Sequence, residues 1–181
     1  MQHQIHDEVS SSKESNEMLK AIKGKYGFIP NLMGVLAESA PVLSSYLQLG
    51  DNLANSSFSP QEIQVMYLAI NYENNCHYCM AAHSTISKAL LSEDVLESLR
   101  SGTSINDPKL NALATFTRKV VDKRGWLDKS DVKSFTDAGY SSANILDVVL
   151  GVAHKTISNY VNHIGNTPVD NAFKAQEWSK N

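Results

Sequence analysis

A well-marked helix start constrains the fold of this chain more than any other feature. Ser59 is a favourable N-cap, Pro60 suits the first helical position, and Glu62, three residues after the serine, completes a capping box. The helix predicted from there to about Tyr72 is apolar on every face over residues 65–70. A helix without a polar face is buried on all sides. We therefore expect this helix at the centre of the molecule, with other helices packed round it.

The rest of the chain also follows helical periodicity, and strand-type alternation is nowhere sustained. The further predicted helices span residues 15–23, 31–38, 41–55, 79–91, 92–100, 107–123, 129–138 and 141–164. The last of them carries a near-heptad apolar stripe, which suits either the core or a subunit contact: Ile145, Val148, Val149, Val152, Ile157, Tyr160, Val161 and Ile164. The sequence thus predicts an all-α fold with one helical domain over residues 15–181. A polar, Ser-rich and flexible segment over residues 1–14 precedes it.

Composition excludes several classes of function. A net charge of −3 and a pI near 6.0 give no electrostatic reason to expect nucleic acid or an acidic membrane surface as partner. No apolar run approaches the roughly 20 residues that span a bilayer, and the N-terminus lacks the hydrophobic stretch of a signal peptide. We expect a cytoplasmic protein, and a reducing compartment disfavours structural disulfides.

The only two cysteines stand three residues apart, and a histidine follows four residues after the second. On a helix with about 3.6 residues per turn, Cys76, Cys79 and His83 fall on one narrow stripe. The polar residues 73–75 form a plausible break and cap, which would place the cysteines in a first helical turn. Free backbone N–H groups and the helix dipole favour thiolate over thiol at that position. The pattern is typical of a redox-active dithiol.

The cysteine pair has two other interpretations. Free cysteines are often inert core residues, and the pair could also be half of a zinc site with His77 and His83 as further ligands. Inert cysteines rarely fall at this spacing with a histidine beyond them. A structural zinc site usually takes a second pair of ligands from another segment, and this chain has no other cysteine. The redox dithiol is the favoured interpretation.

The segment Cys76-His77-Tyr78-Cys79-Met80-Ala81-Ala82-His83 resembles the CxxCxxxH signature of the alkylhydroperoxidase D-like, or carboxymuconolactone decarboxylase, superfamily. Three other stretches are similar to the same superfamily and extend the resemblance to about residues 25–170: residues 59–65, residues 27–32 with 39–41, and residues 155–163. The resemblance implies an AhpD-like helical bundle that assembles into homo-oligomers, usually trimers or hexamers.

The resemblance also implies a thiol-dependent peroxidase with peroxiredoxin activity, which reduces a small-molecule hydroperoxide in antioxidant defence. Cys79 would attack the O–O bond and become a sulfenic acid, and Cys76 would resolve it as a disulfide. An external dithiol electron donor, a thiol reductant protein of unknown identity, would restore the pair. No bound cofactor or metal is expected.

Proton transfer is expected to involve His83, which can accept and return protons near neutral pH. Many members of the superfamily have a relay glutamate where this chain has Gln64, which cannot titrate. Glu73 is the nearest carboxylate that could replace it, or it is simply a capping residue. His77 could tune the thiols, or it could be exposed. Asn159 and His163 are i, i+4 neighbours that either line the site or have a structural role.

Other activities stay open at this stage. The closest alternatives are a general thiol-disulfide oxidoreductase and a redox sensor. A carboxymuconolactone-type decarboxylase is less favoured, because that chemistry needs no CxxC and no Arg/Lys-rich pocket for a dicarboxylate is evident.

Overall fold

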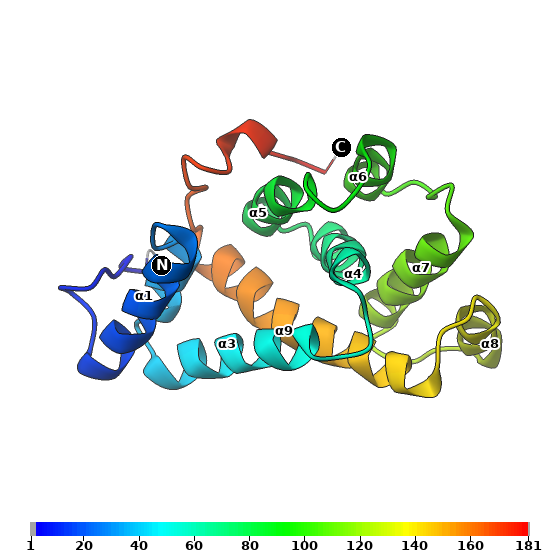
Figure 1. The fold of residues 1–181 in the computed structure, drawn as a ribbon, viewed down its shortest axis with the longest axis horizontal. Helices are drawn as coiled ribbons and strands as arrows, with labels where there is room; N and C mark the ends of the chain where they lie inside the picture. Colours follow the sequence, from blue (N-terminus) through cyan, green and yellow to red (C-terminus); the bar gives the residue numbers. More distant parts are fainter. Residues whose placement is uncertain (1–2, 181) are drawn as a thin grey trace.

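The computed structural model describes residues 3–180, which fold into nine α-helices and no strand (Figure 1). The all-α prediction is therefore confirmed. The helices are α1 (Lys13–Tyr26), α2 (Asn31–Leu36), α3 (Ala40–Ala54), α4 (Pro60–Glu73), α5 (His77–Ser87), α6 (Glu93–Ser101), α7 (Pro108–Asp122), α8 (Lys129–Asp137) and α9 (Ser142–Gly165), followed by a 3₁₀ turn at Lys174–Gln176. In this part of the chain no helix is long and apolar enough to cross a membrane. The division at residue 14 between a flexible segment and the domain stays a prediction.

Helix boundaries follow the capping residues that the sequence displays. Ser59 accepts a hydrogen bond from the backbone N–H of Glu62, and the Glu62 carboxylate accepts one from the backbone N–H of Ser59, so the capping box at the start of α4 is formed. The main departure is α5, which ends at Ser87 instead of continuing to Leu91. The backbone N–H of Leu91 donates a hydrogen bond to the Ser87 carbonyl, and the Leu91 side chain lies in the core.

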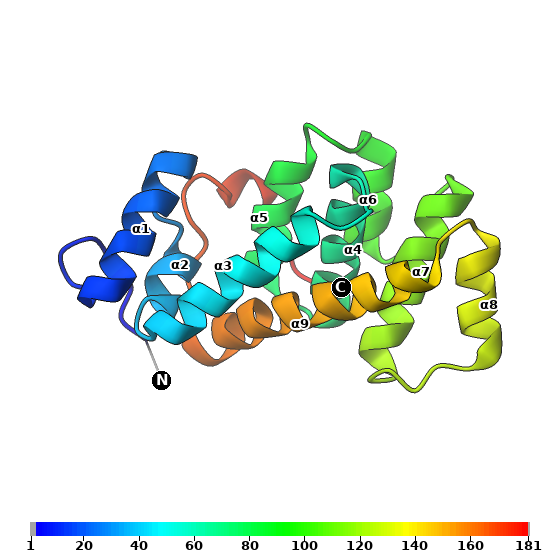
Figure 2. The same ribbon diagram turned by 60° about the horizontal axis from the view of Figure 1, so that its bottom comes forward.

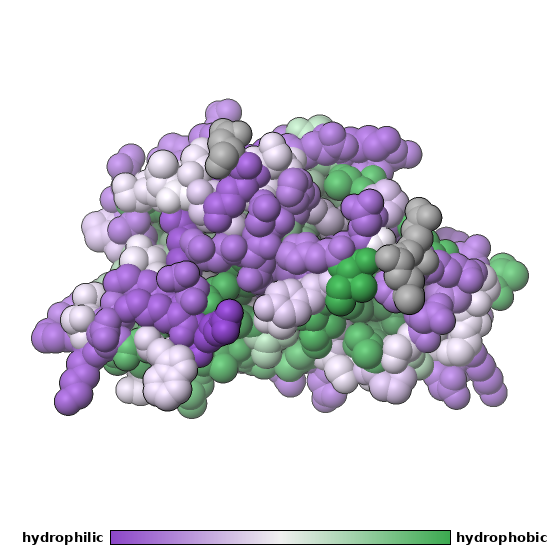
Figure 3. Space-filling model, turned by 180° about the vertical axis from the view of Figure 1, so that it is seen from behind, coloured by the Kyte–Doolittle hydropathy of each residue, from purple (hydrophilic) through white to green (hydrophobic). Residues whose placement is uncertain are grey.

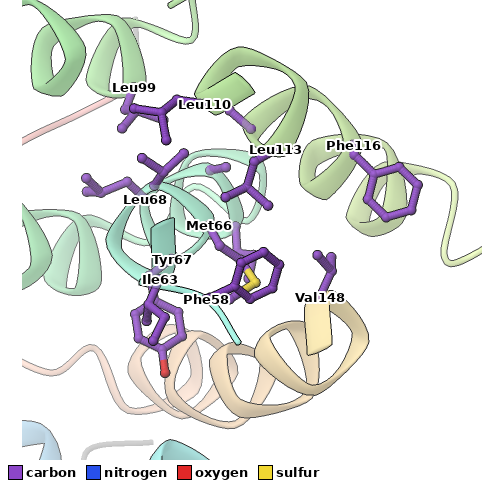
Figure 4. Close-up of a cluster of buried hydrophobic side chains, with 14 of the residues drawn as sticks. Phe58, Ile63, Met66, Tyr67, Leu68, Leu99, Leu110, Leu113, Phe116 and Val148 are labelled. Atoms are coloured by element: carbon purple, nitrogen blue, oxygen red, sulfur yellow. The ribbon is translucent and has the colours of Figure 1, made fainter. Parts of the chain in front are cut away.

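Helix α4 occupies the centre of the molecule, as its apolar faces predict. It packs against α7, α5, α9 and α6 (Figure 1). Side chains of α4 lie between those of α7 and Val148 of α9, and residues 65–70 are at most 6% exposed (Figure 4). Gly151 of α9 permits the close approach of the two helices, because a Cβ there would lie 2.7 Å from the Met66 sulfur.

A second apolar cluster surrounds the two cysteines. It joins side chains of α1, α2, α3 and α5, with the chain after α9 packed against it: Leu19, Ile22, Leu32, Leu36, Ala37, Leu43, Tyr46, Tyr78, Ala82 and, partly buried, Val169 and Phe173. That last segment, residues 166–180, runs past α2 and across α5 (Figure 2). We call it the C-terminal strap. Together with α1 and α2 it covers the dithiol.

Asp170 ties this cover to the cysteine motif. Its carboxylate accepts hydrogen bonds from the backbone N–H of Asn31 at 3.0 Å and from the Tyr78 hydroxyl at 2.5 Å. The Tyr78 oxygen also accepts from the backbone N–H of Leu32 at 3.2 Å. Tyr78 lies between the two cysteines in the sequence, so the strap, α2 and the motif meet at one carboxylate.

Helix α9 differs most from the sequence-based expectation. Of its predicted apolar stripe, only Val148 is fully buried, while Val149, Tyr160 and Ile164 are at least half exposed. Apolar side chains reach the surface in the lower half of the face in Figure 3, the side of the molecule on which α3 and α9 run (Figures 1 and 3). The buried face of α9 is instead largely polar, with Asn144, His154, Lys155, Ser158, Asn159 and Asn162. Of the two interpretations of the stripe, the core one therefore does not apply to Val149, Tyr160 and Ile164, and the subunit contact stays a prediction for them.

Candidate active site

The α4–α5 turn places both cysteines at a helix start. Asn75 adopts a left-handed conformation with φ of 52°, which reverses the chain, and Cys76 is the N-cap of α5. Cys79 is the third helical residue, so the predicted first-turn position is confirmed. The Cys76 backbone N–H donates to the Asn71 carbonyl at 2.9 Å. Both cysteines are free thiols and almost fully buried, at 0% and 1% exposure.

The surroundings distinguish the two thiols electrostatically. Burial opposes ionisation of Cys79, but a hydrogen bond from Cys76, the charge of Lys155 and contacts with Ser158 and Asn159 outweigh it and lower the pKa of Cys79 to about 5. The hydrogen bond to Cys79, together with burial, raises the pKa of Cys76 well above its usual range. Cys79 is therefore the thiolate at neutral pH, and Cys76 is a thiol beside it.

A polar stripe on α9 faces the sulfurs. The Asn162 amide donates to Cys79 Sγ at 3.2 Å and lies 3.9 Å from Cys76 Sγ. Asn159 donates to the Asn71 side chain at 3.0 Å and accepts from Asn74 at 2.8 Å, and so joins α9 to the turn that carries the cysteines. Asn159 therefore lies against the turn that carries the cysteines, and its role in the chemistry stays a prediction.

His83 lies in a hydrogen-bonded chain that the sequence did not reveal. The buried ammonium of Lys155 can only donate, so His83 Nε2, 2.9 Å away, is the acceptor. The ring proton is then on Nδ1, which donates to Gln64 Oε1 at 2.9 Å. Burial and the charge of Lys155 lower the pKa of His83 well below its usual range. His83 is thus a neutral ring with both nitrogens engaged.

Three of the predicted site residues lie away from this network. Glu73 is half-buried at the end of α4, where its charge acts on Arg118. His77 is exposed and packs edge-on against Trp178, with 5.8 Å between ring centroids. His163 is exposed on α9 beside Tyr160. Within residues 3–180, no hydrogen bond joins any of the three to a cysteine, His83 or Gln64. Their catalytic roles stay predictions.

Sequence analysis missed Lys155 and Asn162. A signal for them was present, because residues 155, 158, 159 and 162 are polar and fall at i, i+3, i+4 and i+7 on one helix face. It also missed an aromatic group that packs against His83. The Tyr67 ring lies 4.9 Å from the His83 ring, and its hydroxyl lies 2.7 Å from His154 Nδ1. His154 in turn packs against Tyr46, with 4.2 Å between ring centroids.

We expect His154 to make the fold sensitive to mild acid. Burial and the charge of Lys155 lower its pKa to about 3, whereas an unfolded histidine titrates near 6.5. Between about pH 3 and 6.5 this histidine binds a proton in the unfolded chain but not in the folded chain. The contribution of neutral His154 to the free energy of unfolding is therefore complete above about pH 6.5 and is lost as the pH falls. At about 1.36 kcal/mol per pH unit, the free energy of unfolding should drop by about 2 kcal/mol from pH 6.5 to 5 through His154 alone. His83 acts in the same direction.

Urea unfolding followed by circular dichroism at pH 5.0, 6.0 and 7.5 measures this slope. In His154→Gln the slope should be flatter than in the wild type. An identical slope in both proteins would refute the assignment to His154.

The residues present do not assemble a metal site in the part of the chain that the structure describes. No group of three or more His, Cys, Asp or Glu side chains there is placed to hold an ion. The arrangement instead offers a thiolate, a second thiol beside it, and a buried cation.

No protein-family model and no curated protein sequence matches the chain, so the comparison rests on solved structures. An uncharacterized peroxidase-related protein from Ralstonia eutropha JMP134, described as an alkylhydroperoxidase AhpD core, superposes with a TM-score of 0.84 at 17% identity, over 95% of this chain and 93% of that one. A peroxidase-related protein from Silicibacter sp. TM1040 gives 0.83 at 17% identity, over 97% and 94%.

A third similar structure is the debrominase Bmp8, with a TM-score of 0.74 at 16% identity over 91% of this chain and 90% of that one. A variant of Bmp8 has been solved in complex with 2,3,4-tribromopyrrole. The fold that the sequence resemblance implied is confirmed by these superpositions. The chain has the AhpD-like helical fold.

Proposed function

We propose that this protein is a thiol-dependent peroxidase that reduces organic hydroperoxides through Cys76 and Cys79. The observation that carries the proposal is the placement of two free thiols in the first turn of α5, where one amide, that of Asn162, lies 3.2 Å from Cys79 Sγ and 3.9 Å from Cys76 Sγ. The lowered pKa of Cys79 supports it. A thiolate is the nucleophile towards peroxide oxygen, and a neighbouring thiol condenses with the resulting sulfenic acid. The peroxidase-related proteins of the same fold support it.

The reaction follows from the arrangement of the two sulfurs. Cys79 Sγ attacks the terminal oxygen of the hydroperoxide, the O–O bond breaks, and the alcohol leaves after taking a proton. Cys76 then attacks Cys79 Sγ, the S–O bond breaks, and water departs. The protein is left with a Cys76–Cys79 disulfide, which an external dithiol reduces by exchange. No bound cofactor takes part.

The apolar surroundings of the cysteines favour a hydroperoxide with an organic group. The cluster of α1, α2, α3 and α5 side chains around the sulfurs offers few hydrogen bonds to a polar substrate. We further propose that the protein works in the cytoplasm, where a thiol reductant protein is at hand. The exposed apolar residues of α9 fit a homo-oligomer, which would cover them.

Consumption of an organic hydroperoxide with excess dithiothreitol tests the proposal. Cumene hydroperoxide loss should be catalytic with the wild type and fall to the background of dithiothreitol alone with a Cys76→Ser/Cys79→Ser double variant. Rapid formation of the disulfide without peroxide consumption would contradict the peroxidase and favour a thiol-disulfide oxidoreductase or a redox sensor.

Reductive debromination is a second candidate, because one protein of this fold is a debrominase. Here Cys79 would take the bromine, a proton would replace it on the ring, and Cys76 would release bromide by forming the disulfide. Bromide released from 2,3,4-tribromopyrrole under the same conditions, with no peroxide loss, would favour this reaction over the first.

A further inference from the structure

The Asn162 side chain uses only one of its two polar atoms. Its amide nitrogen donates to Cys79 Sγ at 3.2 Å and lies 3.9 Å from Cys76 Sγ. Asn162 is 5% exposed, and within residues 3–180 its Oδ1 is buried and receives no hydrogen bond. A buried oxygen without a donor is costly and rare in a folded protein, so this atom calls for an explanation.

The neighbouring buried amides do not share this property. Asn71 Oδ1 accepts from Asn159 at 3.0 Å, and Asn159 Oδ1 accepts from Asn74 at 2.8 Å. Other buried side-chain atoms without a partner occur in the described part of the chain, but their residues make no hydrogen bond to a sulfur. An unused acceptor beside the dithiol is therefore particular to Asn162.

The neighbouring sulfur decides how the Asn162 amide is oriented. A thiolate can only accept hydrogen bonds, so the NH₂ group faces Cys79 Sγ and Oδ1 is the other branch of the same planar amide. The lowered pKa of Cys79, about 5, agrees with this orientation. The Asn162 backbone carbonyl accepts from the backbone N–H of Thr167 at 3.3 Å, where the C-terminal strap begins. Opening of the strap would therefore admit a substrate beside this amide.

We propose that Asn162 orients the hydroperoxide, because its Oδ1 accepts a hydrogen bond from the substrate O–H group while its amide nitrogen holds Cys79 Sγ. One rigid group then places the nucleophile and the terminal peroxide oxygen side by side, which is the alignment that the displacement needs. The unused acceptor gains its partner when the substrate binds. This inference rests on the proposed function and names the group by which the site recognises its substrate.

Atoms and charges balance in the step that Asn162 assists. A thiolate electron pair of Cys79 forms the S–O bond, and the O–O bond breaks with its electron pair leaving on the alkoxide, which takes a proton from water. The sulfur is oxidised and the peroxide is reduced. The hydroperoxide proton stays on the transferred oxygen, so the sulfenic acid O–H still donates to Asn162 Oδ1. Because the Asn162 amide nitrogen also lies 3.9 Å from Cys76 Sγ, the sulfenic acid is held near the thiol that resolves it.

The proposed contact defines a substrate class. Hydroperoxides, hydrogen peroxide included, carry a hydrogen on the oxygen that the thiolate attacks, and this O–H group can donate to Asn162 Oδ1. Disulfides and thiosulfonates carry no hydrogen on the sulfur that is attacked, so they react with the same thiolate without this contact. Asn162 therefore favours peroxide reduction over thiol-disulfide exchange.

The ratio of two rate constants tests the proposal. In a Cys76→Ser background Cys79 is the only thiol, and rapid mixing gives its rate constants with tert-butyl hydroperoxide and with methyl methanethiosulfonate. Both reagents react with the thiolate, so the ratio does not depend on how much of Cys79 is ionised. Asn162→Leu keeps the size of the side chain without the amide and should lower the ratio of hydroperoxide to thiosulfonate reactivity at least about tenfold. An unchanged ratio would overturn the proposal.

Two further variants in the same background separate substrate orientation from a structural role. Asn162→Asp keeps an acceptor oxygen and loses the donor, so both rate constants should fall while their ratio stays within about threefold of the parent. Asn159→Leu removes a buried amide whose two polar atoms already have partners, so it should lower both rate constants together and leave the ratio unchanged. A ratio in Asn162→Asp as low as in Asn162→Leu would also overturn the proposal. Asn162→Ala replaces the leucine variant if that protein does not fold.

The same measurement distinguishes this inference from the proposed function. Modification of the Cys76→Ser parent by the thiosulfonate without any reaction with hydroperoxide would overturn the proposed function, and the role of Asn162 with it. Reaction of the parent with both reagents, and the same ratio in Asn162→Leu, would overturn the role of Asn162 alone.

Discussion

The Cys76→Ser variant is expected to consume one equivalent of organic hydroperoxide and then to stop. The Asn162 amide still donates to Cys79 Sγ, and the serine hydroxyl can donate in place of the Cys76 thiol, so the first attack still occurs. The sulfenic acid then has no thiol within reach, because Cys76 is the only other cysteine of the chain. Catalytic turnover should fall to the background of the reductant, while the first equivalent reacts.

Rapid mixing with substoichiometric and excess hydroperoxide separates the two phases, and trapping with dimedone followed by mass spectrometry locates the sulfenic acid on Cys79. Cys79→Ser is the matched control and should give neither a first equivalent nor a dimedone adduct. Steady turnover of Cys76→Ser at the wild-type rate would contradict the assignment of Cys76, since the external thiol would then resolve the sulfenic acid directly.

The helical framework could be predicted because its signals are local. The capping box at Ser59 and the all-round apolar run of residues 65–70 fix α4 and its central position without reference to any partner. The pair Cys76 and Cys79 was also found from local spacing, since their N-terminal position depends only on where α5 begins.

The α9 contribution to the site could not be predicted in the same way. Hydrophobic periodicity assigns the apolar face of a helix to the interior, but on α9 the buried face holds Lys155, Asn159 and Asn162. These side chains are buried because the His83 ring, the amide of Asn71 and the Cys79 sulfur provide partners more than 70 residues away in sequence. Such a pairing depends on tertiary structure, and no local pattern contains it.

The state of His83 illustrates the same limit. Its spacing from Cys79 predicts a proton carrier, and the sequence places it on the correct helix face. Which nitrogen carries the proton, and whether the ring is charged, depend on Gln64 from α4 and Lys155 from α9. The role of a histidine is therefore set by partners that the motif does not include.

Replacing Asp170 with alanine is expected to destabilise the cover of the dithiol. The substitution removes the carboxylate that accepts from the backbone N–H of Asn31 and from the Tyr78 hydroxyl, and it leaves both donors without that partner. Hydrogen bonds to a charged acceptor are worth about 1.5–3 kcal/mol each, so the loss of two should lower the free energy of unfolding by about 3–6 kcal/mol. Urea unfolding at pH 7.5 measures the loss, and Asn171→Ala, an exposed neighbour in the strap, should lie within about 0.5 kcal/mol of the wild type.

The same variant tests whether the strap and α2 limit access to the thiolate. Cys79 is 1% exposed, so a reagent reaches it only when the cover opens. Loss of the hydrogen bond between Asp170 and Tyr78 should raise the fraction of molecules in which the cover of the dithiol is open. Iodoacetamide should then alkylate Cys79 at least about tenfold faster, under conditions in which the variant is still folded. A tenfold change corresponds to about 1.4 kcal/mol in the opening equilibrium, which is less than the expected loss of stability because opening need not break every contact of the strap. Faster alkylation in Asp170→Ala than in Asn171→Ala would show that the Asp170 carboxylate limits opening of the cover, whereas equal rates would mean that reagents reach Cys79 by another route.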